Sequence, residues 1–115
     1  MKKLIVLAVL VFGGFQVLGD FGRSVEPIHD EPYVAVYGRD SCGFTQKMIS
    51  DLKASGVDYQ YFVVDDQRVA DTLHARMDSS GISTRRYNLP VVDVNGGLSV
   101  RPELQKVLRE YNAQL

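Results

Sequence analysis

The chain contains a single cysteine, Cys42, among its 115 residues. One cysteine excludes a disulfide within the chain, and it also excludes a metal site built from four protein cysteines. Basic residues form no cluster, and the formal net charge at pH 7 is -1. Because nucleic-acid surfaces need concentrated positive charge, we expect no nucleic-acid partner. The length suits one small domain, which has to be stabilised by its apolar core without disulfides.

The first residues of the chain, 1–19, have the pattern of a secretory signal peptide. Two lysines stand near the start, and residues 4–11 are continuously apolar, which is the order of a signal's basic and apolar regions. Val17 and Gly19 suit the last positions before a cleavage site at Asp20. The apolar stretch is shorter than the ~20 residues of a spanning helix, so cleavage is favoured over an uncleaved anchor. We therefore expect an exported, periplasmic or secreted protein, which contacts a membrane only if this segment remains attached.

The rest of the chain divides into a short arm and one domain. Residues 20–32 contain two prolines, glycine and several charges, a composition that predicts a linker or an extended arm. Residues 33–115 alternate between strand and helix patterns. The predicted strands are 33–37, 57–64, 90–94 and 98–100, and the predicted helices are 45–55, 67–77 and 103–112. The first two strands should be parallel and the last two should form a hairpin, which gives an α/β fold with a four-stranded mixed sheet, β-α-β-α-β-β-α.

Cys42 lies between the end of the first predicted strand and the start of the first predicted helix. At a helix N-terminus the free backbone N–H groups and the helix dipole both stabilise a negative charge. Both effects favour the thiolate, which is the nucleophilic form of cysteine. Arg39 adds a positive charge nearby and Asp40 a negative one, and the sequence leaves open which lies nearer the sulfur. A buried, inert cysteine is the alternative, but this position favours a chemical role.

Two segments resemble the glutaredoxin family: Arg39-Asp-Ser-Cys-Gly-Phe-Thr45, and Leu89-Pro-Val-Val-Asp-Val-Asn-Gly96 downstream of it. The resemblance covers about residues 33–112, and the tetrapeptide that begins at Cys42 is one residue from the Cys-Gly-Phe-Ser of monothiol glutaredoxins. The resemblance implies a thioredoxin-like, three-layer fold. It also implies a cis peptide bond between Leu89 and Pro90, beside the reactive cysteine.

The resemblance also implies roles for individual residues. Cys42 would be the catalytic nucleophile, and Arg39, alone or together with Arg85 or Arg86, would bind the glycyl carboxylate of glutathione, the co-substrate. The Thr45 hydroxyl would hydrogen-bond the thiolate, and the backbone beside Leu89 and Pro90 would pair with glutathione or a peptide. Because Thr45 stands where dithiol relatives have a second cysteine, a mixed disulfide on Cys42 must be resolved by an external thiol.

Three functions are compatible with these residues. The favoured one is an exported monothiol oxidoreductase that acts on glutathione mixed disulfides or on disulfide protein substrates. The second is an iron–sulfur cluster carrier, in which two chains each supply Cys42 and two glutathiones supply the other ligands; the export signal counts against it. The third is a non-catalytic binding module that uses the groove beside Leu89 and Pro90. It is favoured by the stretch 96–102, which has the family's glycines but lacks the acidic residue that holds glutathione.

Overall fold

In the computed structural model, residues 22–115 are described, and the predicted signal peptide, 1–19, lies outside them. The strands are β1 (Val34–Gly38), β2 (Gln60–Val63), β3 (Val91–Val94) and β4 (Gly97–Val100), and the helices are α2 (Gly43–Ala54), α3 (Gln67–Ser80) and α4 (Leu104–Asn112). The chain order is therefore the predicted one. None of these helices is long and apolar enough to cross a membrane.

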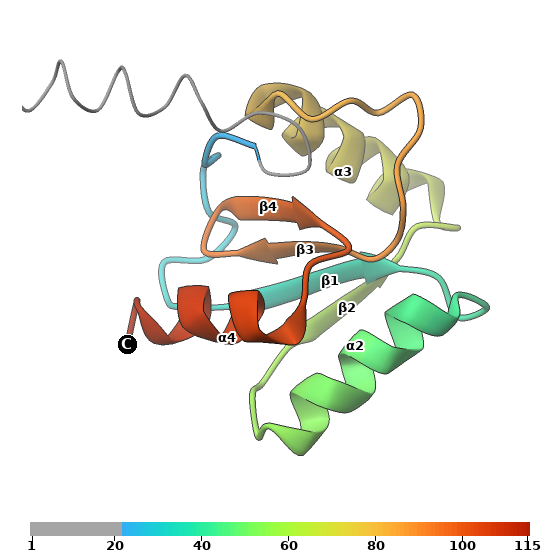
Figure 1. Ribbon diagram of the computed structural model, residues 1–115. Coiled ribbons are helices and arrows are strands. Elements are labelled where there is room, and N and C mark those ends of the chain that lie inside the picture. The colour runs from blue at the N-terminus through green and yellow to red at the C-terminus, as the bar shows by residue number, and fades with distance from the viewer. Residues whose placement is uncertain (1–21) are drawn as a thin grey trace, which may run out of the picture.

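The four strands form one mixed sheet in the order β2-β1-β3-β4. β1 is parallel to β2 and antiparallel to β3, and β3 is antiparallel to β4. Helices α2 and α4 cover one face of the sheet, and α3 covers the other (Figure 1). This three-layer arrangement confirms the predicted α/β, thioredoxin-like fold. The peptide bond between Leu89 and Pro90 is cis.

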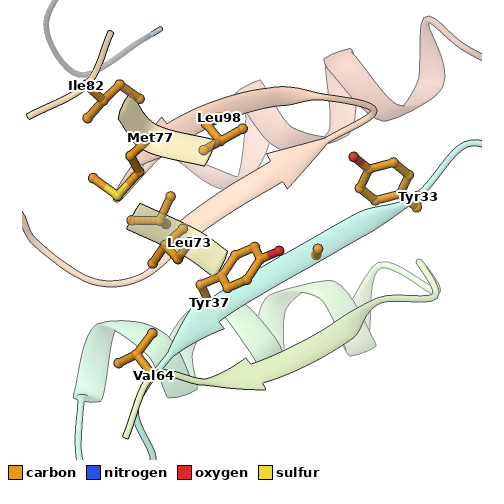
Figure 2. Close-up of a cluster of buried hydrophobic side chains, with 9 residues drawn as sticks. Tyr33, Tyr37, Val64, Leu73, Met77, Ile82 and Leu98 are labelled. Atoms are coloured by element: carbon orange, nitrogen blue, oxygen red, sulfur yellow. The ribbon is translucent and has the colours of Figure 1, made fainter. Parts of the chain in front are cut away.

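β1 is apolar along its whole length because both of its faces are covered. Val34 and Val36 pack with the side chains of α2 and α4. The alternate positions, Ala35 and Tyr37, pack on the other face with residues of α3 such as Leu73 (Figure 2). Successive side chains of a strand point to opposite faces, so a central strand between two helix layers has no solvent-facing position. The two hydrophobic clusters meet at this strand and fix its place in the sheet.

The register of the strands brings distant parts of the chain to one end of the sheet. Tyr37 of β1 lies opposite Val91 of β3, and Val91 lies opposite Val100 of β4. The turn that follows β1, the residues before β3 and the residue after β4 are therefore neighbours. Cys42, the Leu89–Pro90 pair and Arg101 occupy these three places.

Element boundaries differ from the predicted ones for local reasons. The second strand is shorter than the predicted 57–64, because its ladder with β1 begins only at Gln60, opposite Ala35. α3 runs three residues further than predicted, to Ser80, and ends where Gly81 takes a left-handed conformation with φ 88°. Glycine is favoured at this position because it lacks the Cβ that makes positive φ costly.

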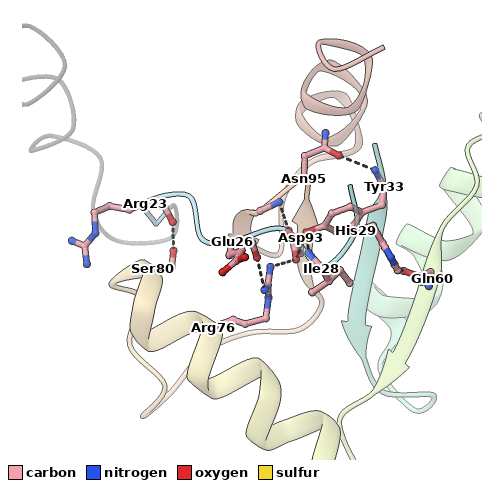
Figure 3. Close-up of polar contacts among 11 residues, drawn as sticks. Arg23, Glu26, Ile28, His29, Tyr33, Gln60, Arg76, Ser80, Asp93 and Asn95 are labelled. Carbon is pink, nitrogen blue, oxygen red and sulfur yellow. Dashed lines mark hydrogen bonds and ion pairs between the residues drawn. The ribbon is translucent and has the colours of Figure 1, made fainter. Parts of the chain in front are cut away.

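Residues 22–32 contain no helix or strand, and they lie against α3 and the β3–β4 turn. The backbone N–H of Arg23 donates to the Ser80 carbonyl over 2.8 Å, and the Ser80 hydroxyl donates to the Arg23 carbonyl over 2.7 Å. The Val25 N–H donates to the carbonyl of Gly96 in the hairpin turn over 2.7 Å. His29 also hydrogen-bonds to Gln60 of β2 over 2.7 Å. This segment is thus hydrogen-bonded to α3, to the hairpin turn and to β2; Figure 3 shows the bonds to α3 and β2.

A buried ion pair joins the same segment to the sheet. Asp93 of β3 is fully buried, and its carboxylate accepts hydrogen bonds from Arg76 of α3, from the Tyr33 hydroxyl and from the Gly96 N–H (Figure 3). Arg76 also donates to the Glu26 carbonyl over 2.8 Å. Burial and the neighbouring carboxylate raise the pKa of Tyr33 to about 12, so this hydroxyl remains a donor at neutral pH. A buried carboxylate is stable only with such partners.

We predict that Arg76→Ala lowers the free energy of unfolding by roughly 3–5 kcal/mol, because it leaves the Asp93 carboxylate buried without its cation. Chemical denaturation measures this change. Arg68→Ala is the matched control on the same helix, since the Arg68 side chain is 93% exposed, and it should change stability by no more than about 0.5 kcal/mol. Equal effects of the two substitutions would contradict a structural role for the buried pair.

Candidate thiol site

Cys42 is the N-cap residue of α2. Its carbonyl accepts the first helical hydrogen bond, from the Gln46 N–H over 3.1 Å, which is why the helix begins at Gly43 and not at the predicted residue 45. The side chain of Cys42 makes no capping hydrogen bond and is partly exposed. The thiol is therefore accessible at the end of the helix where free N–H groups gather.

The surroundings of the sulfur stabilise the thiolate. A hydrogen bond from the Thr45 side chain is the largest cause that lowers the pKa of Cys42 below its ordinary value. Partial burial opposes this shift, while the backbone N–H groups of Thr45 and Phe44 and the positive charge of Arg101 add to it. The result is a thiol with more thiolate at neutral pH than a free cysteine has.

Thr45 is placed by close packing against the end of β1. Its side chain is fully buried, and its hydroxyl oxygen accepts a hydrogen bond from the Arg39 N–H over 3.4 Å. Because that oxygen acts as an acceptor for Arg39, its own proton is available for the sulfur of Cys42. A Cβ on Gly38 would overlap the Thr45 side chain, so only glycine at this position permits the close approach.

The Leu89–Pro90 pair lies beside the sulfur. The Sγ atom of Cys42 is 3.9 Å from the Leu89 carbonyl oxygen. The same oxygen accepts a hydrogen bond of 2.7 Å from Nε of Arg101. Among the described residues the Leu89 N–H has no acceptor. The backbone before the cis-proline is therefore available to a ligand through its N–H, whereas its carbonyl already has a partner.

Arg101 also belongs to this site, although no sequence pattern indicates it. It follows β4, adopts a positive φ of 45°, and donates its own N–H to the Pro90 carbonyl over 2.7 Å. Its guanidinium carbon lies 3.8 Å from the centroid of the Phe44 ring, a cation–π contact. Phe44 is 55% exposed. The predicted hairpin alone would place Arg101 opposite Pro90. The direction of the Arg101 side chain, however, depends on the positive φ of this residue.

Arg39 and Asp40 both contact residues in or just after β2. Nε of Arg39 lies 2.8 Å from a carboxylate oxygen of Asp65, an ion pair whose two side chains are 48% and 60% exposed. The Asp40 carboxylate accepts a hydrogen bond of 2.8 Å from the Tyr61 hydroxyl. The structure thus brings four of the predicted site residues together: Cys42, Thr45, Leu89 and Pro90. The guanidinium of the fifth, Arg39, is paired with Asp65 instead.

A groove of about 320 Å³ runs from this site between the first turns of α2 and α4. Its lining includes apolar, basic and acidic side chains: Phe44, Lys47, Met48, Asp51, Pro90, Arg101, Pro102, Glu103 and Leu104. Within residues 22–115 no group of three or more histidine, cysteine, aspartate or glutamate side chains is placed to hold a metal ion.

Comparison with solved structures supports the fold. The crystal structure of a glutaredoxin from Archaeoglobus fulgidus superposes with a TM-score of 0.51 at 20% sequence identity, over 70% of this chain and 86% of that one. No family model and no curated protein matches the sequence. At this identity the likeness defines a protein with the thioredoxin-like fold of a glutaredoxin. The chemistry of the site has to be argued from its own residues.

We predict that Thr45→Val raises the pKa of Cys42, because valine keeps the shape of the side chain and removes the hydroxyl that donates to the sulfur. The rate of alkylation by iodoacetamide follows the thiolate, and its midpoint should move to higher pH in this variant. Thr45→Ser retains a hydroxyl and should titrate close to the wild type. Coincident pH profiles for Thr45→Val and the wild type would show that the hydroxyl does not stabilise the thiolate.

Proposed function

We propose that this chain is an exported monothiol oxidoreductase that acts on glutathione mixed disulfides through Cys42. The observation that carries the proposal is the environment of the thiol. The sulfur of Cys42 is accessible, its pKa is lowered, and it lies 3.9 Å from the Leu89 carbonyl beside a cis-proline. A nucleophilic thiolate next to a backbone edge that can pair with a peptide is suited to thiol–disulfide exchange.

The reaction has two exchange steps. In the first, the Cys42 thiolate attacks the glutathione sulfur of a mixed disulfide, and the substrate leaves as its thiolate, which takes up a proton from solvent. In the second, the thiolate of a free glutathione attacks the sulfur of the glutathione bound to Cys42. This step releases oxidised glutathione and regenerates the Cys42 thiolate. Each step breaks one disulfide and forms one, so glutathione is the only reductant that the cycle needs.

The external thiol is required because the chain has no other cysteine. Thr45 lies one helical turn after Cys42, at the position where a second thiol would form an internal disulfide, and its buried hydroxyl stabilises the thiolate. The same group therefore favours Cys42 as an attacking nucleophile and also as a leaving group in the second step, because a thiol of lower pKa leaves faster.

The substrate contact that we propose is the N–H of Leu89, in the backbone segment that lies beside the sulfur. The Pro90 side chain is fully buried, so its role is to hold that backbone in place through the cis peptide bond. The free Leu89 N–H is a donor for the backbone carbonyl of the cysteine in glutathione. Arg39 is the predicted partner of the glycyl carboxylate. To bind Arg39, that carboxylate has to displace Asp65 from the ion pair. That pair is exposed, and exposed pairs contribute little stability.

We predict that the protein beginning at Asp20 accelerates reduction of a glutathione mixed disulfide by reduced glutathione, and that Cys42→Ser loses all of this acceleration. Turnover is measured by coupling the oxidised glutathione to a reductase. Matching thermal unfolding curves would establish that the variant is folded. A wild-type rate equal to that of Cys42→Ser would contradict the oxidoreductase. In that case a brown product on anaerobic reconstitution with iron, sulfide and glutathione would identify the cluster carrier instead.

The export part of the proposal rests on the basic and apolar pattern of residues 1–19. We predict that the full chain, produced in a bacterial host, is recovered from the periplasm or the medium with Asp20 as its first residue. The intact mass measures this. A full-length product confined to the cytosol would contradict export and would leave the exchange chemistry to be judged by the turnover assay.

A further inference from the structure

We propose that Arg101 is the carboxylate-binding residue of the Cys42 site, and that the site therefore prefers disulfides whose thiol carries a carboxylate. This inference rests on the proposed exchange chemistry and names a substrate class for it. The groove between the first turns of α2 and α4 is where such a carboxylate would lie. Arg101, Phe44 and Pro90 are among its lining residues.

Arg101 differs from two neighbouring cations, Arg39 and Lys47, because each of these forms an ion pair with a carboxylate. Arg39 is paired with Asp65 over 2.8 Å, and Lys47 is paired with Asp51 over 2.7 Å. Among the described residues no carboxylate lies within 4.0 Å of the Arg101 guanidinium. Of the three cations Arg39, Lys47 and Arg101, Arg101 is thus the one that can bind an incoming anion without first losing an ion pair.

Two contacts hold the guanidinium of Arg101 and a third fixes its backbone, and together they leave the outer edge of the guanidinium open. Its Nε atom donates to the Leu89 carbonyl, and its plane lies against the Phe44 ring. Its backbone is fixed by the hydrogen bond to the Pro90 carbonyl. The two terminal nitrogens have no acceptor among the described residues. A planar fork held in this way binds a carboxylate with two hydrogen bonds at little cost in side-chain entropy.

The position of Arg101 relative to the sulfur also suits this role. Nε of Arg101 and Sγ of Cys42 contact the same oxygen, at 2.7 Å and 3.9 Å. A carboxylate three bonds from the attacked sulfur, as in dithiodipropionate, can therefore reach the guanidinium, and so can the carboxylates of glutathione, which longer flexible chains join to the sulfur. The groove contains two carboxylates. Asp51 is paired with Lys47, whereas Glu103 is exposed and makes no side-chain hydrogen bond at the start of α4. Removing Glu103 should therefore increase the preference for anions.

The test uses single exchanges of the protein with three small disulfides. These are dithiodipropionate, which is anionic, hydroxyethyl disulfide, which is neutral, and cystamine, which is cationic. The pseudo-first-order rate of adduct formation on Cys42 is followed by intact mass, and the anionic rate is divided by the neutral rate. Because a change in the pKa of Cys42 affects both rates alike, the ratio reports charge recognition alone.

We expect Arg101→Gln to lower this ratio about tenfold, the size of one charge-assisted hydrogen bond, and Arg101→Lys to recover part of it. Glu103→Gln should raise the ratio. Arg109→Gln, an exposed residue in the last turn of α4, removes the same charge elsewhere and should leave the ratio unchanged.

An unchanged ratio in Arg101→Gln, or a loss found in Arg39→Gln instead, would overturn the proposal. The single exchange needs neither glutathione nor turnover, so its result is separate from that of the catalytic assay. A chain that turns over glutathione disulfides but shows no dependence on Arg101 would keep the proposed function and lose this inference. A chain that shows the Arg101 dependence without turnover would lose the proposed function and keep the inference that Arg101 binds the carboxylate.

Discussion

The antiparallel pairing of β1 with β3 is the interaction on which the site depends. Tyr37 lies opposite Val91, so the chain that leaves β1 toward Cys42 meets the chain that enters β3 from Leu89 and Pro90. A register shift of one residue would move every side chain of a strand to the other face. The two apolar clusters on either side of β1 prevent this, and core packing thereby fixes the distance between the thiol and the cis-proline.

The reactivity of the thiol is set by groups that are part of the fold. Burial of the sulfur favours the neutral thiol, whereas the Thr45 hydroxyl, two backbone N–H groups and the charge of Arg101 favour the thiolate and prevail. Thr45 occupies a fully buried position made available by Gly38. Arg101 reaches the site because β4 ends opposite the start of β3. Each group is positioned by an element whose own stability comes from the core, so the site is formed before any substrate binds.

The sequence was sufficient to predict the order of the elements and the place of Cys42, because hydrophobic periodicity and turn residues are local signals. It did not predict the role of Arg101, which depends on a positive φ of 45° and on the length of a hairpin. The ion pair of Arg39 with Asp65 and the buried pair of Arg76 with Asp93 were not predicted either, for a different reason. Both pairs join residues that are far apart in the chain, and hydrophobic periodicity, which is a local pattern, does not indicate such contacts.

The central claim is that Cys42, the Leu89–Pro90 backbone and Arg101 form one substrate site. A crystal structure of the mixed disulfide between Cys42 and glutathione tests it most directly. We expect the glutathione backbone to pair with the Leu89 N–H and one of the glutathione carboxylates to bind the Arg101 guanidinium. A glutathione that extends into solvent, or one that places its carboxylates on Arg39 and away from Arg101, would contradict the account.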